Sequence, residues 1–290
     1  METATPGVKS TSDGWLNRYL QARRAPANDP ATLFRAVALT TALPRMLQGT
    51  APALAMSQVG RFGIRGGQAG AAAGESFEAA YAAAADHVLS GAGREAFNAI
   101  RMLQASDPSK YQPANGADYP RSPFGQALRQ IAQLTKAHMG LEVAFAEVGG
   151  WDTHANQGAA QGQLAGRLDD FARAIAAFIV DLDDRMEDTV VVTMSEFGRA
   201  VNQNGSGGTD HGHGNAMMVI GGGVRGGRVF GAWPGLAIDR RYDGRDLAVT
   251  TDFRDVFAEI VTRHMGVADA RPVFPGYATS AAKFPGLFAA

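Results

Sequence analysis

Cysteine is absent from this chain of 290 residues, and so is any long apolar run. Without cysteine the chain forms no disulfide and no thiolate metal site, so a bound metal would need histidine and carboxylate ligands. A membrane-spanning helix needs about 20 consecutive apolar residues. No stretch of this sequence approaches that length, and we therefore expect no membrane span.

An excess of charge of either sign is also missing. Lysine and arginine number 27 against 28 acidic residues, which gives a formal net charge of −1. Proteins that bind nucleic acid usually carry a basic surface that neutralises phosphates, so this balance argues against a nucleic-acid partner. The first residues contain neither the basic segment nor the apolar segment of an export signal.

What the sequence does contain is an alternation of helical and strand patterns. Helices are predicted at 71–104, from Ser122-Pro123 onward, at 163–186 and at 252–265, with helical pieces at 15–60 and a loop at 105–121. Apolar runs at 141–148, 189–194 and 216–220 predict strands. Continuously apolar strands between helices are typical of a parallel or mixed sheet covered on both faces. The chain length allows one large α/β domain or two small ones.

Polar side chains lie next to each of the three predicted strands. They are Asp152 and His154 after the first strand, Ser195 and Glu196 after the second, and Asp210, His211 and His213 before the third. Ligands bind at the carboxyl ends of strands in such sheets, so these loops are expected to converge.

The pairs Asp152/His154 and His211/His213 share an i, i+2 spacing, which in an extended chain points both side chains the same way. Each pair alone also fits a structure without a ligand: Asp152 and His154 could lie in an ordinary turn, and His211 and His213 in a flexible polar loop. Together they favour a metal site, because Asp and His are ligands that zinc accepts.

Ser195 allows another interpretation, as a nucleophile. The surrounding sequence lacks the G-x-S-x-G elbow of hydrolases, which favours a carboxylate ligand at Glu196 or a hydrogen-bonding role for Ser195. Arg199 follows and is either an anion contact or an ordinary surface arginine.

Four motifs together resemble one bacterial family. They are GGWDTH at 149–154, TMSEFGR at 193–199, TDHGHG at 209–214 and GGGVRGG at 221–227, with further similarity in DGWLNRYL at 13–20 and LPRMLQG at 43–49. The pattern is similar to the domain-of-unknown-function family fifteen-oh-one, which is usually placed in the alkaline phosphatase and sulfatase superfamily. The resemblance implies a three-layer α/β/α sandwich with a metal centre at the strand ends.

The resemblance also implies a ligand set. By analogy, one divalent ion is held by Asp152, His154 and His213, and a second by Glu196, with Asp210 and His211 as further candidate ligands. Zinc is the expected metal, with manganese, calcium and magnesium as alternatives. A substrate would be a small anionic phosphate or sulfate ester, whose oxyanion Arg199 would contact.

The resemblance further implies that the chain is truncated at its amino end. Family members carry a twin-arginine export signal and an early strand, and the superfamily nucleophile comes from that early region. We therefore expect a single domain over 1–290 that lacks its first strand, with a mostly helical part at 15–140 and a metal-site α/β part at 141–290. Family members are exported, so a periplasmic location is expected.

Three functional hypotheses follow. The first is a metal-dependent phosphate or sulfate ester hydrolase. The second is a non-catalytic exported metal-binding or scaffold protein with a degenerate site, with a companion exported protein as its expected partner. The third is a serine esterase that uses Ser195, His211 and Asp210.

Overall fold

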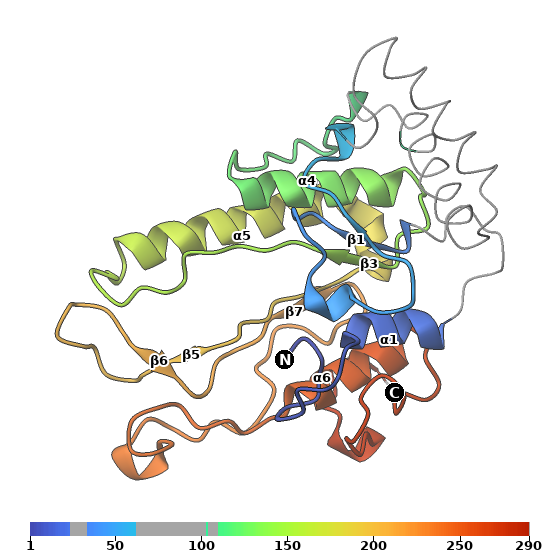
Figure 1. The fold of residues 1–290 in the computed structure, drawn as a ribbon. Helices are drawn as coiled ribbons and strands as arrows, with labels where there is room; N and C mark the ends of the chain where they lie inside the picture. Colours follow the sequence, from blue (N-terminus) through green and yellow to red (C-terminus); the bar gives the residue numbers. More distant parts are fainter. Residues whose placement is uncertain (24–33, 62–102, 104–109, 290) are drawn as a thin grey trace.

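The computed structural model describes residues 1–23, 34–61, 103 and 110–289 (Figure 1). Nearly all of the predicted helix at 71–104 lies outside these residues, as do residues 105–109 of the predicted loop. Within the described chain no helix is long and apolar enough to cross a bilayer, as the sequence led us to expect.

Two helices begin at a residue whose side chain caps them, and the cap at Ser122 is the one that the sequence predicts. Helix α4, Pro123–Lys136, has proline in its first turn, and the Ser122 hydroxyl accepts a hydrogen bond of 3.1 Å from the Gly125 amide. Helix α6, Phe253–Glu259, starts after Asp252, whose carboxylate accepts from the Arg254 amide at 2.9 Å. It continues as a π-helix, Ile260–His264. The other helices are α1, Trp15–Ala22, and α5, Gln163–Leu182, which is followed by a 3₁₀ segment, Asp183–Asp188.

The strands of the described residues form three small sheets. A parallel sheet has the order β2-β1-β3, with β1 at Ala36–Ala38, β2 at Leu54–Ala55 and β3 at Val143–Phe145. Strand β4, Val190–Val192, pairs antiparallel with β7, Val219–Gly221. Strand β5, Gly198–Arg199, pairs antiparallel with β6, His211–Gly212. The three predicted strands at 141–148, 189–194 and 216–220 are confirmed, each in a shorter form.

One prediction was wrong in part. Helical pieces were expected over 15–60, and α1 is there, but β1 and β2 lie in the same region. Alanine, the strongest helix former, occupies two of the three positions of β1. Its strand conformation is fixed by pairing with both neighbours rather than by local preference.

Helices cover the parallel sheet on both faces. In β1, Val37 belongs to the apolar cluster that includes α4 and α5, whereas Ala36 and Ala38 belong to the cluster that includes α1 and α6. All three residues are fully buried. Figure 1 shows α4 and α5 on one side of the strands and α1 and α6 on the other. The protein is therefore a mixed α/β structure with a small parallel sheet, as the α/β prediction requires.

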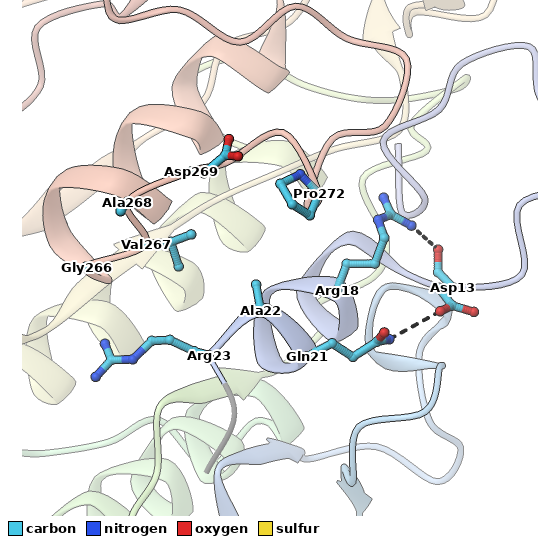
Figure 2. Close-up of a pocket in the computed structure, with 10 residues that line it drawn as sticks. All are labelled: Asp13, Arg18, Gln21, Ala22, Arg23, Gly266, Val267, Ala268, Asp269 and Pro272. Atoms are coloured by element: carbon cyan, nitrogen blue, oxygen red, sulfur yellow. Dashed lines mark hydrogen bonds between the residues drawn. The ribbon is translucent and has the colours of Figure 1, made fainter.

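Helix α1 is fastened to the amino-terminal and carboxyl-terminal segments by Arg18. Its guanidinium donates to the carbonyl oxygens of Val273 at 2.9 Å and of Asp13 and Thr3 at 2.5 Å each. A hollow of about 600 Å³ lies beside it, between α1 and residues 266–272 (Figure 2). The hydrogen bonds of Arg18 are all to backbone carbonyls, so this cation serves the fold.

Candidate metal centre

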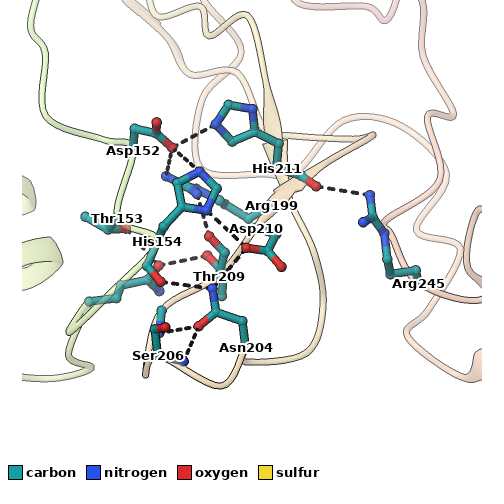
Figure 3. A network of polar contacts seen from close by, with 12 residues as sticks. Asp152, Thr153, His154, Arg199, Asn204, Ser206, Thr209, Asp210, His211 and Arg245 are labelled. Atoms are coloured by element: carbon teal, nitrogen blue, oxygen red, sulfur yellow. Dashed lines mark hydrogen bonds and ion pairs between the residues drawn. The ribbon is translucent and has the colours of Figure 1, made fainter.

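Three side chains from two separate loops meet at one carboxylate oxygen. Asp152 and His154 follow β3, and His211 lies in β6. The Nε2 atoms of His154 and His211 lie 2.9 and 2.7 Å from Oδ1 of Asp152 (Figure 3). One ligand atom from each of the three residues lies within 4.8 Å of the others. Each side chain is about half exposed, between 46% and 54%, so the cluster is open to solvent.

A fourth residue, Asp210, holds the far side of the His154 ring. Its Oδ1 lies 3.0 Å from Nδ1 of His154. The Asn204 amide donates to the same oxygen at 2.9 Å and to the His154 carbonyl oxygen at 2.9 Å. Histidines that bind metals usually present their second nitrogen to a carboxylate in this way. Asp210 therefore fixes the orientation of the His154 ring.

The protons of His154 add a chemical argument. Its two nitrogens face two carboxylates, Asp152 and Asp210. A neutral imidazole carries hydrogen on one nitrogen only, so one of these contacts would oppose a lone pair to a carboxylate oxygen. Both contacts are favourable only if the ring carries a second proton or if a metal cation lies between one ring nitrogen and its carboxylate.

The two carboxylates stay ionised to lower pH than usual. The hydrogen bond from His211 is the main cause that lowers the pKa of Asp152, and the charges of His154 and Arg199 contribute. The pKa of Asp210 is lowered chiefly by hydrogen bonds from Asn204 and His154. Both groups are therefore anionic at neutral pH, which favours a bound cation.

Arg199, the expected oxyanion contact, joins the two loops instead. One terminal nitrogen donates to the Thr209 carbonyl oxygen at 2.6 Å. The other contacts the Trp151 carbonyl oxygen and lies 3.2 Å from Asp152 Oδ1. The guanidinium carbon also lies 4.9 Å from the centre of the Phe197 ring. These contacts fix Arg199 beside Asp152 and give each terminal nitrogen at least one partner.

Glycine lets the loops approach closely enough for this convergence. A Cβ atom at Gly208 would lie 2.3 Å from the His154 carbonyl carbon, and one at Gly212 would lie 2.3 Å from that of Arg199. Both are closer than real Cβ contacts, so a larger residue would force the backbones apart. Close packing of the two backbones therefore requires glycine at positions 208 and 212.

The donor set fits a divalent cation. Zinc binds imidazole nitrogen and carboxylate oxygen at about 2 Å, so its ligand atoms lie within about 4 Å of one another. The nitrogen–oxygen separations of 2.9 and 2.7 Å are already inside that limit. Two imidazoles favour zinc or manganese over calcium and magnesium, which prefer oxygen ligands.

The structure places the other predicted ligands elsewhere. His213, the expected partner of Asp152 and His154, stacks on Tyr242 with ring centres 3.8 Å apart and is absent from the cluster. His211 takes its place. Glu196 is exposed and also outside the cluster. The segment that follows β4 contributes two other residues. They are Phe197, whose ring stacks on His211 with ring centres 4.3 Å apart, and Arg199.

The esterase arrangement of Ser195, His211 and Asp210 is not formed. The Ser195 hydroxyl donates to the Phe197 carbonyl oxygen at 3.0 Å. His211 contacts Asp152, and Asp210 contacts His154. A serine nucleophile needs a base within hydrogen-bond reach, and no hydrogen bond joins Ser195 to a histidine in the described chain.

Two residues of the site had no signal in the sequence. Asn204 lies in a polar stretch that was interpreted as a flexible loop, and its amide oxygen accepts from the amides of Ser206 at 2.9 Å and Gly208 at 3.1 Å. Gln157 accepts hydrogen bonds of 2.8 Å from the hydroxyls of Thr153 and Thr209 and so ties the two loops together. Neither contact follows from residue spacing.

Comparison with known families identifies the chain. The family model described as protein of unknown function, DUF1501, matches residues 1–274, and the chain therefore belongs to this family. No curated protein and no solved structure matches the chain.

Proposed function

We propose that Asp152, His154 and His211 bind a divalent metal ion, zinc in the first place, and that the centre hydrolyses phosphate or sulfate esters. The observation that carries this proposal is the position of His154 between two carboxylates, with Nε2 facing Asp152 and Nδ1 facing Asp210. A cation at Nε2 leaves the single ring hydrogen for Asp210 and relieves the conflict between lone pairs.

Each residue has a distinct task in this proposal. Asp152, His154 and His211 supply the ligand atoms, and Asp210 holds the proton on Nδ1 of His154. Arg199 keeps positive charge beside Asp152 and fixes the distance between the loops. When bound, the metal would supply polarisation of an ester oxygen. The half-exposed cluster is accessible to a small anionic ester.

The family resemblance supports the reaction class. It implies the alkaline phosphatase and sulfatase superfamily, an α/β/α sandwich, export to the periplasm and the same use of Asp152 and His154. Helices on both faces of the parallel sheet are in agreement with that sandwich.

A second candidate is a metal-binding protein without turnover. The observation that favours it is the engagement of Arg199, whose terminal nitrogens donate to two backbone carbonyls and Asp152. These contacts direct three of the five N–H hydrogens toward the protein rather than toward a substrate. In this case the metal would stabilise the junction of the two loops in an exported binding or scaffold protein.

Metal content and turnover separate the two candidates. The full chain is dialysed, its zinc and manganese are measured, and it is assayed with p-nitrophenyl phosphate and p-nitrophenyl sulfate. Bound metal with turnover that is lost in His154→Ala and kept in His213→Ala supports the hydrolase. Bound metal without turnover favours the binding protein. A chain that takes up neither metal rules out both candidates.

A further inference from the structure

Exposed apolar side chains gather on one stretch of the surface. Of the eleven large apolar side chains that are exposed in the described chain, six lie within residues 229–249. They are Val229, Trp233, Leu236, Ile238, Tyr242 and Val249. Val229, Ile238 and Trp233 protrude furthest, with 95%, 71% and 70% of their surface exposed. Single exposed apolar residues are common on proteins, but a cluster of this size marks a surface that contacts an apolar partner.

These residues belong to an arm, residues 227–249, whose returning limb is fixed to the rest of the protein. The Tyr242 ring stacks on His213 with ring centres 3.8 Å apart. The Arg245 guanidinium donates to the His211 carbonyl oxygen at 3.1 Å. The returning limb is therefore held in place by contacts with β6 and with the histidine that follows it.

The outgoing limb, residues 227–240, projects away from the helices. It changes direction at Gly231 and Gly235, whose φ angles of +103° and +84° favour glycine. It ends in a 3₁₀ helix, Ile238–Arg240. Figure 1 shows this short helix, in orange, at the outer end of the arm and away from α1 and α6. No strand forms in this part of the described chain, so the limb presents side chains and not a strand edge to its surroundings.

Arginines accompany the apolar side chains. Between residues 225 and 241 lie four of them, Arg225, Arg228, Arg240 and Arg241, and one acidic residue, Asp239, which together give a formal charge of +3. The formal net charge of the whole chain is −1, so positive charge is concentrated here. Within the described chain, the one ion pair of this stretch joins Arg240 to Asp239 at 3.5 Å, and both side chains are largely exposed. The positive charge is therefore accessible to an anionic partner.

The surface of an anionic bilayer fits both properties of the arm. Tryptophan is enriched at the boundary between lipid and water, and aliphatic side chains of a projecting segment can enter the acyl region beside it. Arginine binds phosphate groups, and a negatively charged lipid surface attracts it. A small apolar ligand would instead need a concave pocket, whereas Val229, Trp233 and Ile238 protrude from the protein.

We propose that the arm docks the protein on a bilayer that contains anionic phospholipid. Val229, Trp233 and Ile238 insert at the interface between headgroups and acyl chains, and Arg228 and Arg240 contact the headgroup phosphates. The insertion removes the most exposed apolar side chains of the described chain from water. This inference does not depend on the proposed metal centre.

Vesicle sedimentation with the full chain tests the proposal. Sucrose-loaded vesicles of phosphatidylcholine with about one third phosphatidylglycerol are compared with vesicles of phosphatidylcholine alone. Binding to the anionic vesicles is expected, at least about tenfold tighter than to the neutral ones, and it should weaken as the salt concentration rises. No binding to the anionic vesicles, or equal binding to both kinds, would overturn the proposal.

Paired variants assign the binding to the arm. Ile238→Ser removes an inserted apolar side chain and Arg228→Gln removes a charge, and each should weaken binding to anionic vesicles by at least about fivefold. The matched variants Val180→Ser and Arg173→Gln change exposed residues of α5 and should bind like the parent chain. His154→Ala should also bind normally, which separates this proposal from the metal centre. An equal loss in the α5 variants, or no loss in the arm variants, would contradict docking through the arm.

Tryptophan fluorescence reports insertion directly. Trp233 is 70% exposed, so its emission should shift to shorter wavelength when the ring enters the bilayer. Trp233→Phe should abolish this shift and still bind vesicles. Binding of the parent chain without a shift would indicate adsorption by charge alone, and a shift that persists in Trp233→Phe would place insertion elsewhere; either result refutes the proposal. So would a dimer that depends on Trp233 and Ile238 without vesicle binding, which would assign the arm to a second copy of the chain.

Discussion

Two carboxylates of this protein stand in opposite environments. Asp181 on α5 is fully buried and accepts four hydrogen bonds, from Tyr111, Tyr119, Lys136 and the Ala114 amide. Asp152 is 54% exposed, and its partners are two imidazoles and Arg199. Asp181 connects the segment at 111–119 to helices α4 and α5. Asp152 connects two loops at the surface.

The partners explain the different tasks. Lysine and tyrosine donors keep their hydrogens at neutral pH, so the Asp181 cluster is saturated and has no room for a ligand. Imidazole nitrogens can exchange a hydrogen for a metal ion, and solvent reaches the Asp152 cluster. We therefore expect substitutions at Asp181 to alter stability and substitutions around Asp152 to alter metal binding.

The largest expected effect is on zinc affinity in His154→Ala. Removal of one ligand should weaken zinc binding by more than about 100-fold, because even partners behind a ligand contribute about 10–100-fold. Competition titration against a chromogenic chelator measures the change. His213→Ala is the matched control and should bind zinc like the parent chain, since His213 stacks on Tyr242 outside the cluster. A larger loss in the control would restore the ligand set expected from the sequence.

Asp181→Asn should give the largest loss of stability. The change leaves Lys136 without its anionic partner inside the core, and breaking such a buried pair costs on the order of 3 kcal/mol. Urea unfolding followed by circular dichroism measures the free energy of unfolding. Asp184→Asn, at an exposed position in the next turn, should change it by less than about 0.5 kcal/mol. An equal loss of stability in Asp152→Asn would show that Asp152 is as important for folding as Asp181.

The zinc affinity of Asp210→Asn tests the orienting contact. The amide cannot match the carboxylate as a partner for Nδ1 of His154, so zinc binding should weaken by about 10–100-fold, less than in His154→Ala. The same chelator competition gives the value. If Asp210→Asn weakens binding as much as His154→Ala does, Asp210 is itself a ligand, as the sequence allowed.

Acid should remove the stability that Asp181 contributes. Burial alone would raise its pKa, but the hydrogen bonds from Lys136 and the tyrosines outweigh burial and lower it. A carboxyl group whose pKa is lower in the folded state contributes its full stabilisation at pH values above its unfolded-state pKa of about 3.9. This stabilisation is lost as the pH falls from there through the folded-state pKa. The difference in stability between the parent chain and Asp181→Asn should therefore shrink below about pH 4. A constant difference would show that charge plays no part.

The sequence predicted the elements near the site better than the contacts inside it. Helix starts at Ser122-Pro123 and Asp252 and the three apolar strands follow from local chemistry and periodicity. The short strands β1 and β2 could not be recognised, because pairing with neighbours distant in sequence fixes them. The three predicted apolar strands also did not indicate which strand pairs with which.

Within the site, the sequence indicated the two loops and the residue types. It could not distinguish His211 from His213, because both precede the same predicted strand and both adjoin Gly212. The antiparallel pairing of β5 with β6 makes the distinction, since it places His211 opposite Arg199 beside Asp152. The tie between Asn204 and Asp210 depends on the path of a polar loop, which has no periodic pattern.

Ser195→Ala should have the smallest effect and tests the serine esterase hypothesis. The Ser195 hydroxyl is engaged with the Phe197 carbonyl oxygen, and no histidine is hydrogen-bonded to it. Turnover of p-nitrophenyl phosphate, if the chain catalyses it, should therefore change by no more than about twofold, which corresponds to the loss of a surface hydrogen bond. A loss of about 100-fold or more, together with turnover that survives chelation, would contradict the metal centre and favour the serine esterase. Because the metal hypothesis requires the reverse on both counts, His154→Ala and Ser195→Ala assayed side by side with and without chelator distinguish the two chemistries.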